Sequence, residues 1–96
     1  MDEKKVTGLL VELQELYRKE GERNYDHGFS AALAALCDQG LPELERWSEA
    51  RSIYRTMAGS KSGFSDFYID RDTVEERILE NKRLDEIRQQ LWLLFE

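Results

Sequence analysis

The sequence predicts an all-α fold, a small four-helix, bundle-like domain with a structured loop between the third and fourth helices. Apolar residues recur at intervals of three and four in four separate segments, the spacing of amphipathic helices. One proline and six glycines occur in 96 residues, and most of them fall between these segments. A hydrophobic fraction of 41% and this length favour a single domain over residues 1–96.

The first helix is expected over about residues 2–19. Asp2 and Glu3 suit the positive N-terminal end of a helix, and Gly21 is expected to end it. Its apolar face is formed by Val6, Leu9, Leu10, Leu13, Leu16 and Tyr17.

The second helix, Phe29–Cys37, is expected to be the central, buried helix of the domain. From Ala31 to Cys37 it contains only Ala, Leu and Cys, and Ala and Leu are strong helix formers. A helix without a polar face must be covered on nearly all sides. It is expected to begin near Asn24 and to stop before a left-handed Gly40. Cys37, the only cysteine, is interpreted as a small buried hydrophobe.

The third helix is expected over about residues 42–58, followed by a loop from Gly59 to Ser65 that is rich in Gly and Ser. The apolar face of this helix is formed by Leu44, Trp47, Ala50, Ile53, Tyr54 and Met57. After the loop, an extended segment over residues 64–69 is expected to dock on the core. Phe67 and Ile69 lie two apart and would point inward, whereas Tyr68 would point outward.

The last helix is expected from a capping box of Asp72 and Glu75 to about Phe95. Its apolar stripe is formed by Val74, Ile78, Leu84, Ile87, Leu91 and Leu94. Asn81 interrupts the stripe, so it should either bond to the preceding loop or mark a bend. The final turn, residues 91–95, is apolar on every side. It predicts either self-association or a partner groove at this helix, or a helix end tucked under the first helix.

No catalytic residue, metal or cofactor is predicted. His27 is the only histidine and is interpreted as a surface or capping residue. The Gly59–Gly63 stretch lacks the phosphate-loop pattern and follows the negative end of a helix. The enzymatic alternative is a Mg²⁺-dependent all-α nucleotide pyrophosphohydrolase that uses carboxylates, since hard cations need several carboxylate oxygens. Its candidates are Glu12, Glu15, Glu75, Glu76 and Glu80, although a complementary ExxD helix is missing.

The formal net charge of −6 disfavours a nucleic-acid partner and is compatible with a basic protein partner. The N-terminal residues MDEKKV are charged and contain no apolar signal region. No apolar run approaches the length of a membrane span. A cytoplasmic protein without a membrane partner is therefore expected.

The stretch GFSDFYI, followed by N-x-x-L-x-x-I-R-x-x-L from Asn81 to Leu91, resembles a family of small uncharacterised bacterial helical proteins. That family carries a Gly-Met-Gly-Ser-x-Asn-Asp-type loop before an Asn-containing last helix. Asp66 would match its Asp, Phe67 and Ile69 its apolar positions, and Asn81 its helical Asn. Ser65, Lys61 and the Ser62–Gly63 pair depart from the pattern. The resemblance implies an all-α domain with a structured loop and brings no known activity.

The resulting hypothesis is a small acidic, non-catalytic protein-binding module, such as an immunity-type inhibitor of a toxin or a small regulator. The candidate binding residues are Phe64, Asp66, Tyr68 and Trp92. Asp66 has two interpretations. It either closes the Gly59–Ser65 loop or reaches a donor such as Asn81, or it meets a basic group of the partner.

Overall fold

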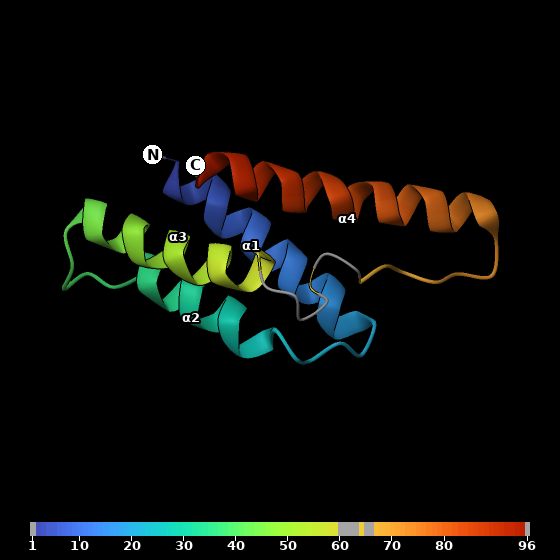
Figure 1. Ribbon diagram of the computed structural model, residues 1–96, viewed down its shortest axis with the longest axis horizontal. Coiled ribbons are helices and arrows are strands. Elements are labelled where there is room, and N and C mark those ends of the chain that lie inside the picture. Colours follow the sequence, from blue (N-terminus) through green and yellow to red (C-terminus); the bar gives the residue numbers. More distant parts are fainter. Residues whose placement is uncertain (1, 60–63, 65–66, 96) are drawn as a thin grey trace.

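The computed structural model describes residues 2–59, 64 and 67–95, and over these residues it confirms the all-α prediction. Within the described ranges there are four helices and no strand. The helices are α1 (Glu3–Lys19), α2 (Asp26–Leu36), α3 (Glu43–Gly59) and α4 (Val74–Leu94). They form an elongated domain of 46 × 22 × 20 Å (Figure 1).

The central helix is α1, and the prediction that the second helix takes this place is wrong. In Figure 1, α1 crosses between α4 on one side and α2 with α3 on the other, and it packs against both α2 and α4. Its apolar stripe is almost completely excluded from water. The residues that carry the stripe are Val6, Leu9, Leu10, Leu13 and Tyr17.

The helix α2 lies at the edge of the domain, where it packs against α3 and α1. Ser30 and Ala34 are exposed and Leu33 is only half-buried, whereas Phe29 is fully buried. Cys37 is also exposed, which corrects the interpretation as a buried hydrophobe. The physical reason is that the exposed side chains Ser30, Ala34 and Cys37 are small, so leaving this face in water costs little free energy.

The end of α1 follows the left-handed glycine pattern that the sequence predicts. Gly21 has a φ of 79°. The N–H of Glu22 donates to the carbonyl of Tyr17 (2.9 Å), and the N–H of Gly21 donates to the carbonyl of Arg18 (3.0 Å). Gly21 is the only described glycine with a positive φ, so the left-handed stop expected at Gly40 is wrong.

The start of α4 is capped by Thr73, one residue later than predicted. Its hydroxyl accepts a hydrogen bond from the N–H of Glu76 at 3.2 Å. Thr73 and Glu76 have the hydroxyl-x-x-Glu spacing of a capping box, and a threonine hydroxyl is the usual group in that role. The predicted Asp72–Glu75 pair is therefore wrong by one position.

Aromatic rings join the helices around one fully buried side chain, Phe64. The ring of Tyr17 in α1 lies 5.3 Å from it, that of Tyr25 5.2 Å, and that of Tyr54 in α3 5.9 Å, centroid to centroid. Phe67 packs on Tyr17 at 4.3 Å. The chain between α3 and α4 is thus anchored in the core at Phe64 and Phe67, as expected for a docked segment.

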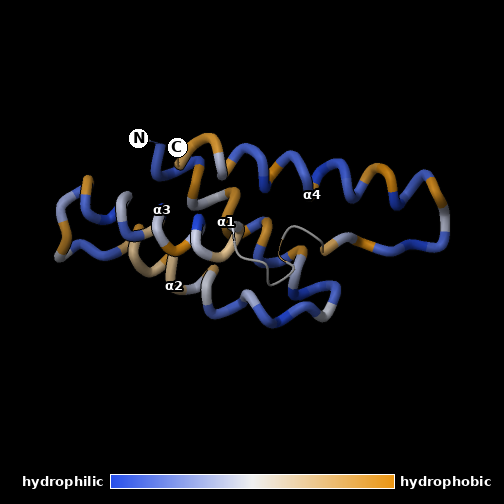
Figure 2. Tube along the Cα trace, in the orientation of Figure 1, coloured by the Kyte–Doolittle hydropathy of each residue, from blue (hydrophilic) through white to orange (hydrophobic). Residues whose placement is uncertain are grey.

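The apolar stripe predicted for α4 is buried only in its second half, where Leu84, Ile87 and Leu91 are fully buried. The first half extends beyond the other helices (Figure 1), and hydrophobic turns lie along it (Figure 2). Val74 is 56% exposed and Ile78 is 62% exposed, which corrects the prediction for these two residues. Leu44, at the start of α3, is likewise 70% exposed rather than buried.

Candidate functional site

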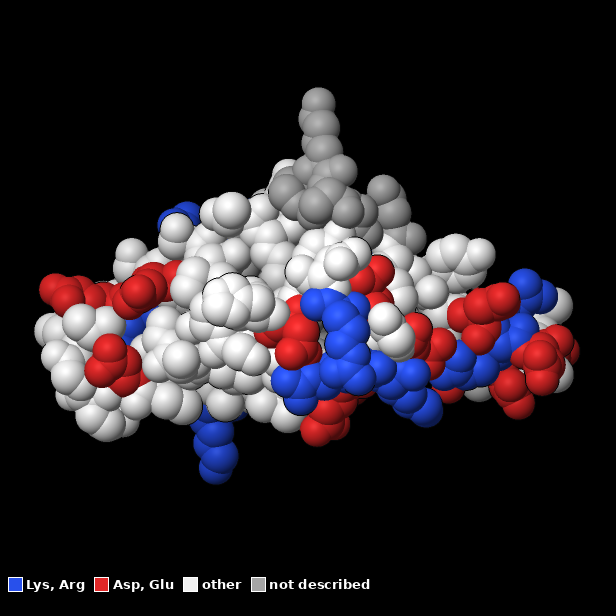
Figure 3. Space-filling model, turned by 90° about the horizontal axis from the view of Figure 1, so that it is seen from below, with Lys and Arg blue, Asp and Glu red and all other residues white. Residues whose placement is uncertain are grey.

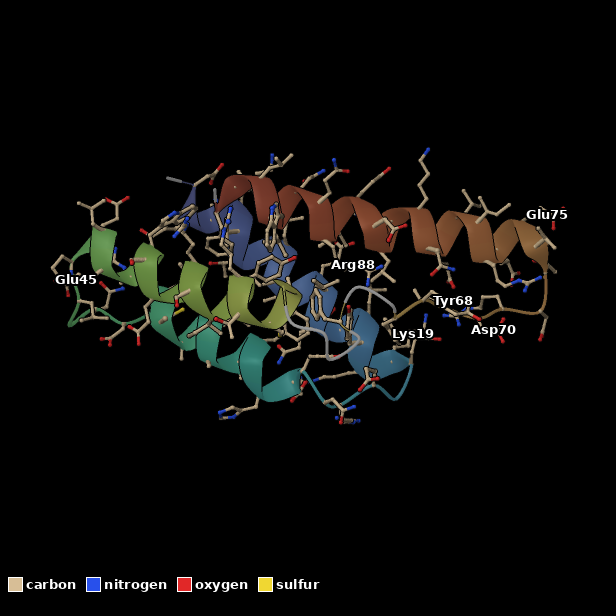
Figure 4. All side chains as sticks on the ribbon, in the orientation of Figure 1. Lys19, Glu45, Tyr68, Asp70, Glu75 and Arg88 are labelled. Carbon is tan, nitrogen blue, oxygen red and sulfur yellow. The ribbon has the colours of Figure 1, made fainter. Side chains whose placement is uncertain are left out.

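Residues 67–73, hereafter the 67–73 segment, run beside the exposed first half of α4 (Figures 1 and 4). Asn81 holds the segment in place. Its side-chain oxygen accepts from the N–H of Ile69 at 2.6 Å, and its side-chain nitrogen donates to the carbonyl of Ile69 at 2.7 Å. The same nitrogen donates to the carbonyl of Arg77. The prediction that Asn81 bonds to the preceding loop is confirmed.

Arg88 fixes the chain that leads into this segment. One guanidinium nitrogen donates to the carbonyls of Phe64 (2.8 Å) and Phe67 (3.1 Å) and to the hydroxyl of Tyr17 (3.2 Å). The other terminal nitrogen donates to Asp85 at 2.7 Å. The arginine side chain is only 12% exposed, so its bonds to Phe64, Phe67 and Tyr17 are partly buried, whereas the bond to the exposed Asp85 lies at the surface. The sequence showed only its helical pairing with Asp85.

The phenol of Tyr17 belongs to the same network and donates to the carbonyl of Phe64 at 2.8 Å. Burial raises the pKa of Tyr17 to about 12, although Arg88 acts in the opposite direction. The hydroxyl therefore stays protonated at neutral pH and serves as a donor to the backbone. Tyr17 and Arg88 together position the start of the 67–73 segment.

A shallow groove of about 300 Å³ lies between this segment and α4. We call it the Tyr68 groove, and its lining residues are Tyr68, Val74, Arg77, Ile78 and Asn81. Tyr68 is 65% exposed, whereas Ile69 beside it is fully buried and Phe67 is partly buried. The predicted alternation of inward and outward side chains is therefore confirmed.

The 67–73 segment carries two exposed acidic side chains beside the groove, whose lining contains one charged residue, Arg77. Asp70 and Asp72 are exposed, and Arg77 lies 3.8 Å from Asp70. Arg71 turns away to Glu20 (2.7 Å) and Glu80 (2.6 Å), and the bond to Glu20 raises the pKa of Arg71. In the view of Figure 3, acidic and basic side chains are interleaved along the right half of the molecule, and the area just left of the centre is largely uncharged.

The structure separates the predicted binding residues. Tyr68 lines the groove and is accessible, but Phe64 is fully buried in the core, so its prediction as an accessible binding residue is wrong. Asp66, with both of its interpretations, lies outside the described residues. Trp92 is 39% exposed and lines a separate hollow of about 340 Å³ next to Arg88. The guanidinium of Arg55 lies 4.5 Å from its ring.

The C-terminal turn of α4 is packed rather than free on every side. Leu91 and Phe95 are fully buried, and the ring of Phe95 lies 5.1 Å from that of Trp47 and 5.6 Å from that of Tyr54. The helix end is therefore tucked in: the ring of Phe95 packs against α3, while α4 packs along α1, as one of the two predicted alternatives has it. Leu93 keeps an exposed side chain on the outer face of the helix.

The carboxylates proposed for a magnesium site do not converge. Both oxygens of Glu12 accept from Arg83 at 2.8 Å, and these bonds lower the pKa of Glu12. Glu80 is paired with Arg71. Within residues 2–59, 64 and 67–95, no group of three or more His, Cys, Asp or Glu is placed to hold a metal ion.

Comparisons of the chain with known protein families, curated proteins and solved structures found no match. The family resemblance of the C-terminal part of the chain therefore stays a prediction. None of the helices in the described part of the chain has the length and apolar character needed to cross a membrane.

Sequence reasoning missed several residues that build the groove. The apolar spacing of α4 predicts a core position for Val74 and Ile78, which the structure leaves exposed. In the sequence, Arg77 and Arg88 look like ordinary charged residues on the exposed face of a helix. The only indication was Asn81, an amide in the middle of an apolar stripe, which pointed to the contact with Ile69.

Proposed function

We propose that this protein is a non-catalytic protein-binding module that receives an apolar, positively charged segment of a partner protein in the Tyr68 groove. One observation carries the proposal. Tyr68, Val74 and Ile78 are all more than half exposed, and they line a single groove. Contiguous exposed apolar side chains on a small protein mark interaction sites, whereas scattered ones need no explanation.

The wall of the groove is held by hydrogen bonds, which favours a defined binding site. Asn81 and Arg88 bind the backbone on both sides of Tyr68, so the groove wall is held before a partner arrives. A preformed wall reduces the conformational entropy that is lost on binding. The partner's apolar side chains would remove Val74 and Ile78 from water, which is the main favourable contribution to such an association.

Charge selects the kind of partner. The chain has a formal net charge of −6, and Asp70 and Asp72 are exposed in the 67–73 segment beside the groove, although neither lines it. A basic partner is attracted over long range and gains association rate and specificity. An immunity-type inhibitor that covers a basic toxin, or a small regulator of a basic protein, would use this surface in the same way.

A random-peptide display library is a direct test, since it requires no identified partner. Wild-type protein should enrich peptides that combine Lys or Arg with large apolar residues. A Tyr68→Ser, Ile78→Ser double variant should bind the enriched peptides at least about tenfold more weakly, because both apolar contacts are lost. Leu44→Ser is the matched control, because Leu44 is equally exposed but lies at the start of α3.

The proposal fails if no peptide is enriched, or if the double variant binds as well as wild type. It also fails if the enriched peptides are acidic. Equal losses of binding in the groove variant and in Leu44→Ser would show nonspecific apolar adhesion rather than a defined site.

A further inference from the structure

We infer that the partner segment binds as an extended strand, which pairs with the outer edge of residues 67–70. This inference rests on the proposed function and extends the contact from the Tyr68 groove, on the α4 side of Tyr68, to the backbone edge on its other side. It starts from the inner edge of the same segment. There, Asn81 bonds to both the N–H and the carbonyl of Ile69, and Arg88 bonds to the carbonyl of Phe67.

The side-chain amide of Asn81 thus pairs with Ile69 as a residue of a neighbouring β-strand would. In an extended chain, the N–H and carbonyl of one residue point to the same side, and those of the next residue point to the opposite side. Burial follows the same period of two, since Ile69 is fully buried while Tyr68 and Asp70 are exposed. The N–H and carbonyl of Tyr68 and the N–H of Asp70 therefore point away from α4.

These three backbone groups have no hydrogen-bond partner in the part of the chain that the structure describes. The carbonyl of Asp70 accepts from the guanidinium of Arg71 at 2.7 Å, which closes the edge at that end. An unpaired strand edge is a template for another strand, and peptides are commonly recognised by such β-addition. A helical segment in the groove would leave all three groups unpaired.

The side chains of this edge define what the added strand must carry. Tyr68 and Asp70 lie two apart and share the outward face. Residues directly opposite each other in paired strands have neighbouring side chains on the same face. The partner strand therefore needs an apolar residue opposite Tyr68 and a Lys or Arg two positions along, opposite Asp70. A second copy of this chain fits poorly, because it brings its own Asp70 and Asp72 to the same edge.

The probe that tests this binding mode is the acetylated and amidated heptapeptide VTKTVTK, which carries valine and lysine in alternation on one face. It is titrated into ¹⁵N-labelled full-length protein, and amide shifts and hydrogen exchange are recorded. Saturation should slow exchange of the Tyr68 and Asp70 amides by at least about tenfold, since both gain a hydrogen-bond acceptor. Tyr68→Ser should weaken the binding of this peptide, whereas Ile78→Ser should not, because Ile78 lies on the α4 side of the segment.

Two N-methylated forms of the peptide provide the internal control. A residue opposite Tyr68 directs its own N–H toward the protein, whereas its neighbours direct theirs away. N-methylation of the valines should weaken binding by about tenfold or more, while N-methylation of the threonines should leave the affinity unchanged. Equal effects of the two modifications would overturn the strand-pairing mode.

The remaining outcomes separate this inference from the proposed function. If a helix-forming Leu–Lys peptide binds in the groove more tightly than VTKTVTK, with the Tyr68 and Asp70 amides unprotected, strand addition is wrong and the binding function stands. If those amides become protected on concentrating the protein alone, the occupant is a second copy. If neither peptide binds and the display library gives no enrichment, both proposals fail.

Discussion

The two halves of α4 are built on the same apolar spacing but have opposite environments. In the second half, Leu84, Ile87 and Leu91 are fully buried, whereas in the first half Val74 and Ile78 stand more than half exposed. The difference lies in the neighbours, since the other helices do not extend beside the first half (Figure 1). Apolar periodicity therefore identifies the face of a helix but does not show whether another element covers that face.

The comparison assigns different tasks to the two halves. Burial in the second half contributes to folding, at about 25 cal/mol for each Å² of apolar area removed from water. In the first half, the same kind of side chain remains hydrated, so its burial is still available to a binding partner. The following predictions test this assignment, beginning with the largest expected effect.

Isoleucine truncation in each half gives the largest contrast. Ile87→Ala should lower the free energy of unfolding by about 2–5 kcal/mol, because it removes buried carbons and leaves a cavity. Ile78→Ala should change it by no more than about 0.5 kcal/mol, because Ile78 is mostly exposed. Urea denaturation measures both. Similar losses for the two variants would show that the first half also belongs to the core.

Arg88→Met should destabilise the protein by about 2–3 kcal/mol, because two backbone carbonyls and the Tyr17 hydroxyl lose a charged donor. Arg77→Met is the matched control in the first half, since its side chain is 43% exposed and its closest acidic partner is 3.8 Å away. Thermal unfolding should show a clear decrease in Tm for the first variant only. An equal decrease for Arg77→Met would contradict the assignment.

Asn81→Ala should cost about 1–3 kcal/mol, since both backbone groups of Ile69 lose their partner. The loss should be local as well as global, and amide hydrogen exchange at Ile69 should accelerate more than exchange at Leu91. Gln89→Ala, an exposed position in the second half, serves as the control. Unchanged exchange at Ile69 would show that Asn81 does not hold the 67–73 segment.

Acidification should produce the smallest effect, through the arginine-paired carboxylates Glu12 and Glu20. Hydrogen bonds from Arg83 and Arg71 hold the pKa of each below its ordinary value of 4.5. A lowered folded-state pKa contributes stability that is present above pH 4.5 and is lost as the pH falls toward the folded-state value. Urea denaturation at pH 6 and pH 3.5 should show this decrease, and Arg71→Met should reduce it. An equal loss of stability on acidification in that variant and in wild type would show that Glu20 does not contribute to the pH dependence.

Much of the fold could be predicted from the sequence because its signals are local. The helix extents follow from the apolar spacing, and the end of α1 follows from the glycine at position 21. The outward direction of Tyr68 follows from the alternation of side chains along an extended chain. The place of α2 at the edge and the exposure of Ile78 depend on which helices become neighbours. Arg88 contacts Tyr17 across 71 positions of sequence, a separation over which no spacing rule applies.

The central claim is that the exposed apolar side chains of the first half of α4, Val74 and Ile78, contribute to binding and not to folding. The most direct test is urea denaturation of wild type and Ile78→Ser, each with and without a peptide selected from the display library. Without peptide, the two free energies of unfolding should agree within about 0.5 kcal/mol. Peptide at about a hundred times its Kd should stabilise wild type by roughly 2.7 kcal/mol and Ile78→Ser far less. A variant destabilised by about 2 kcal/mol without peptide, or one stabilised by peptide as much as wild type, would contradict the claim.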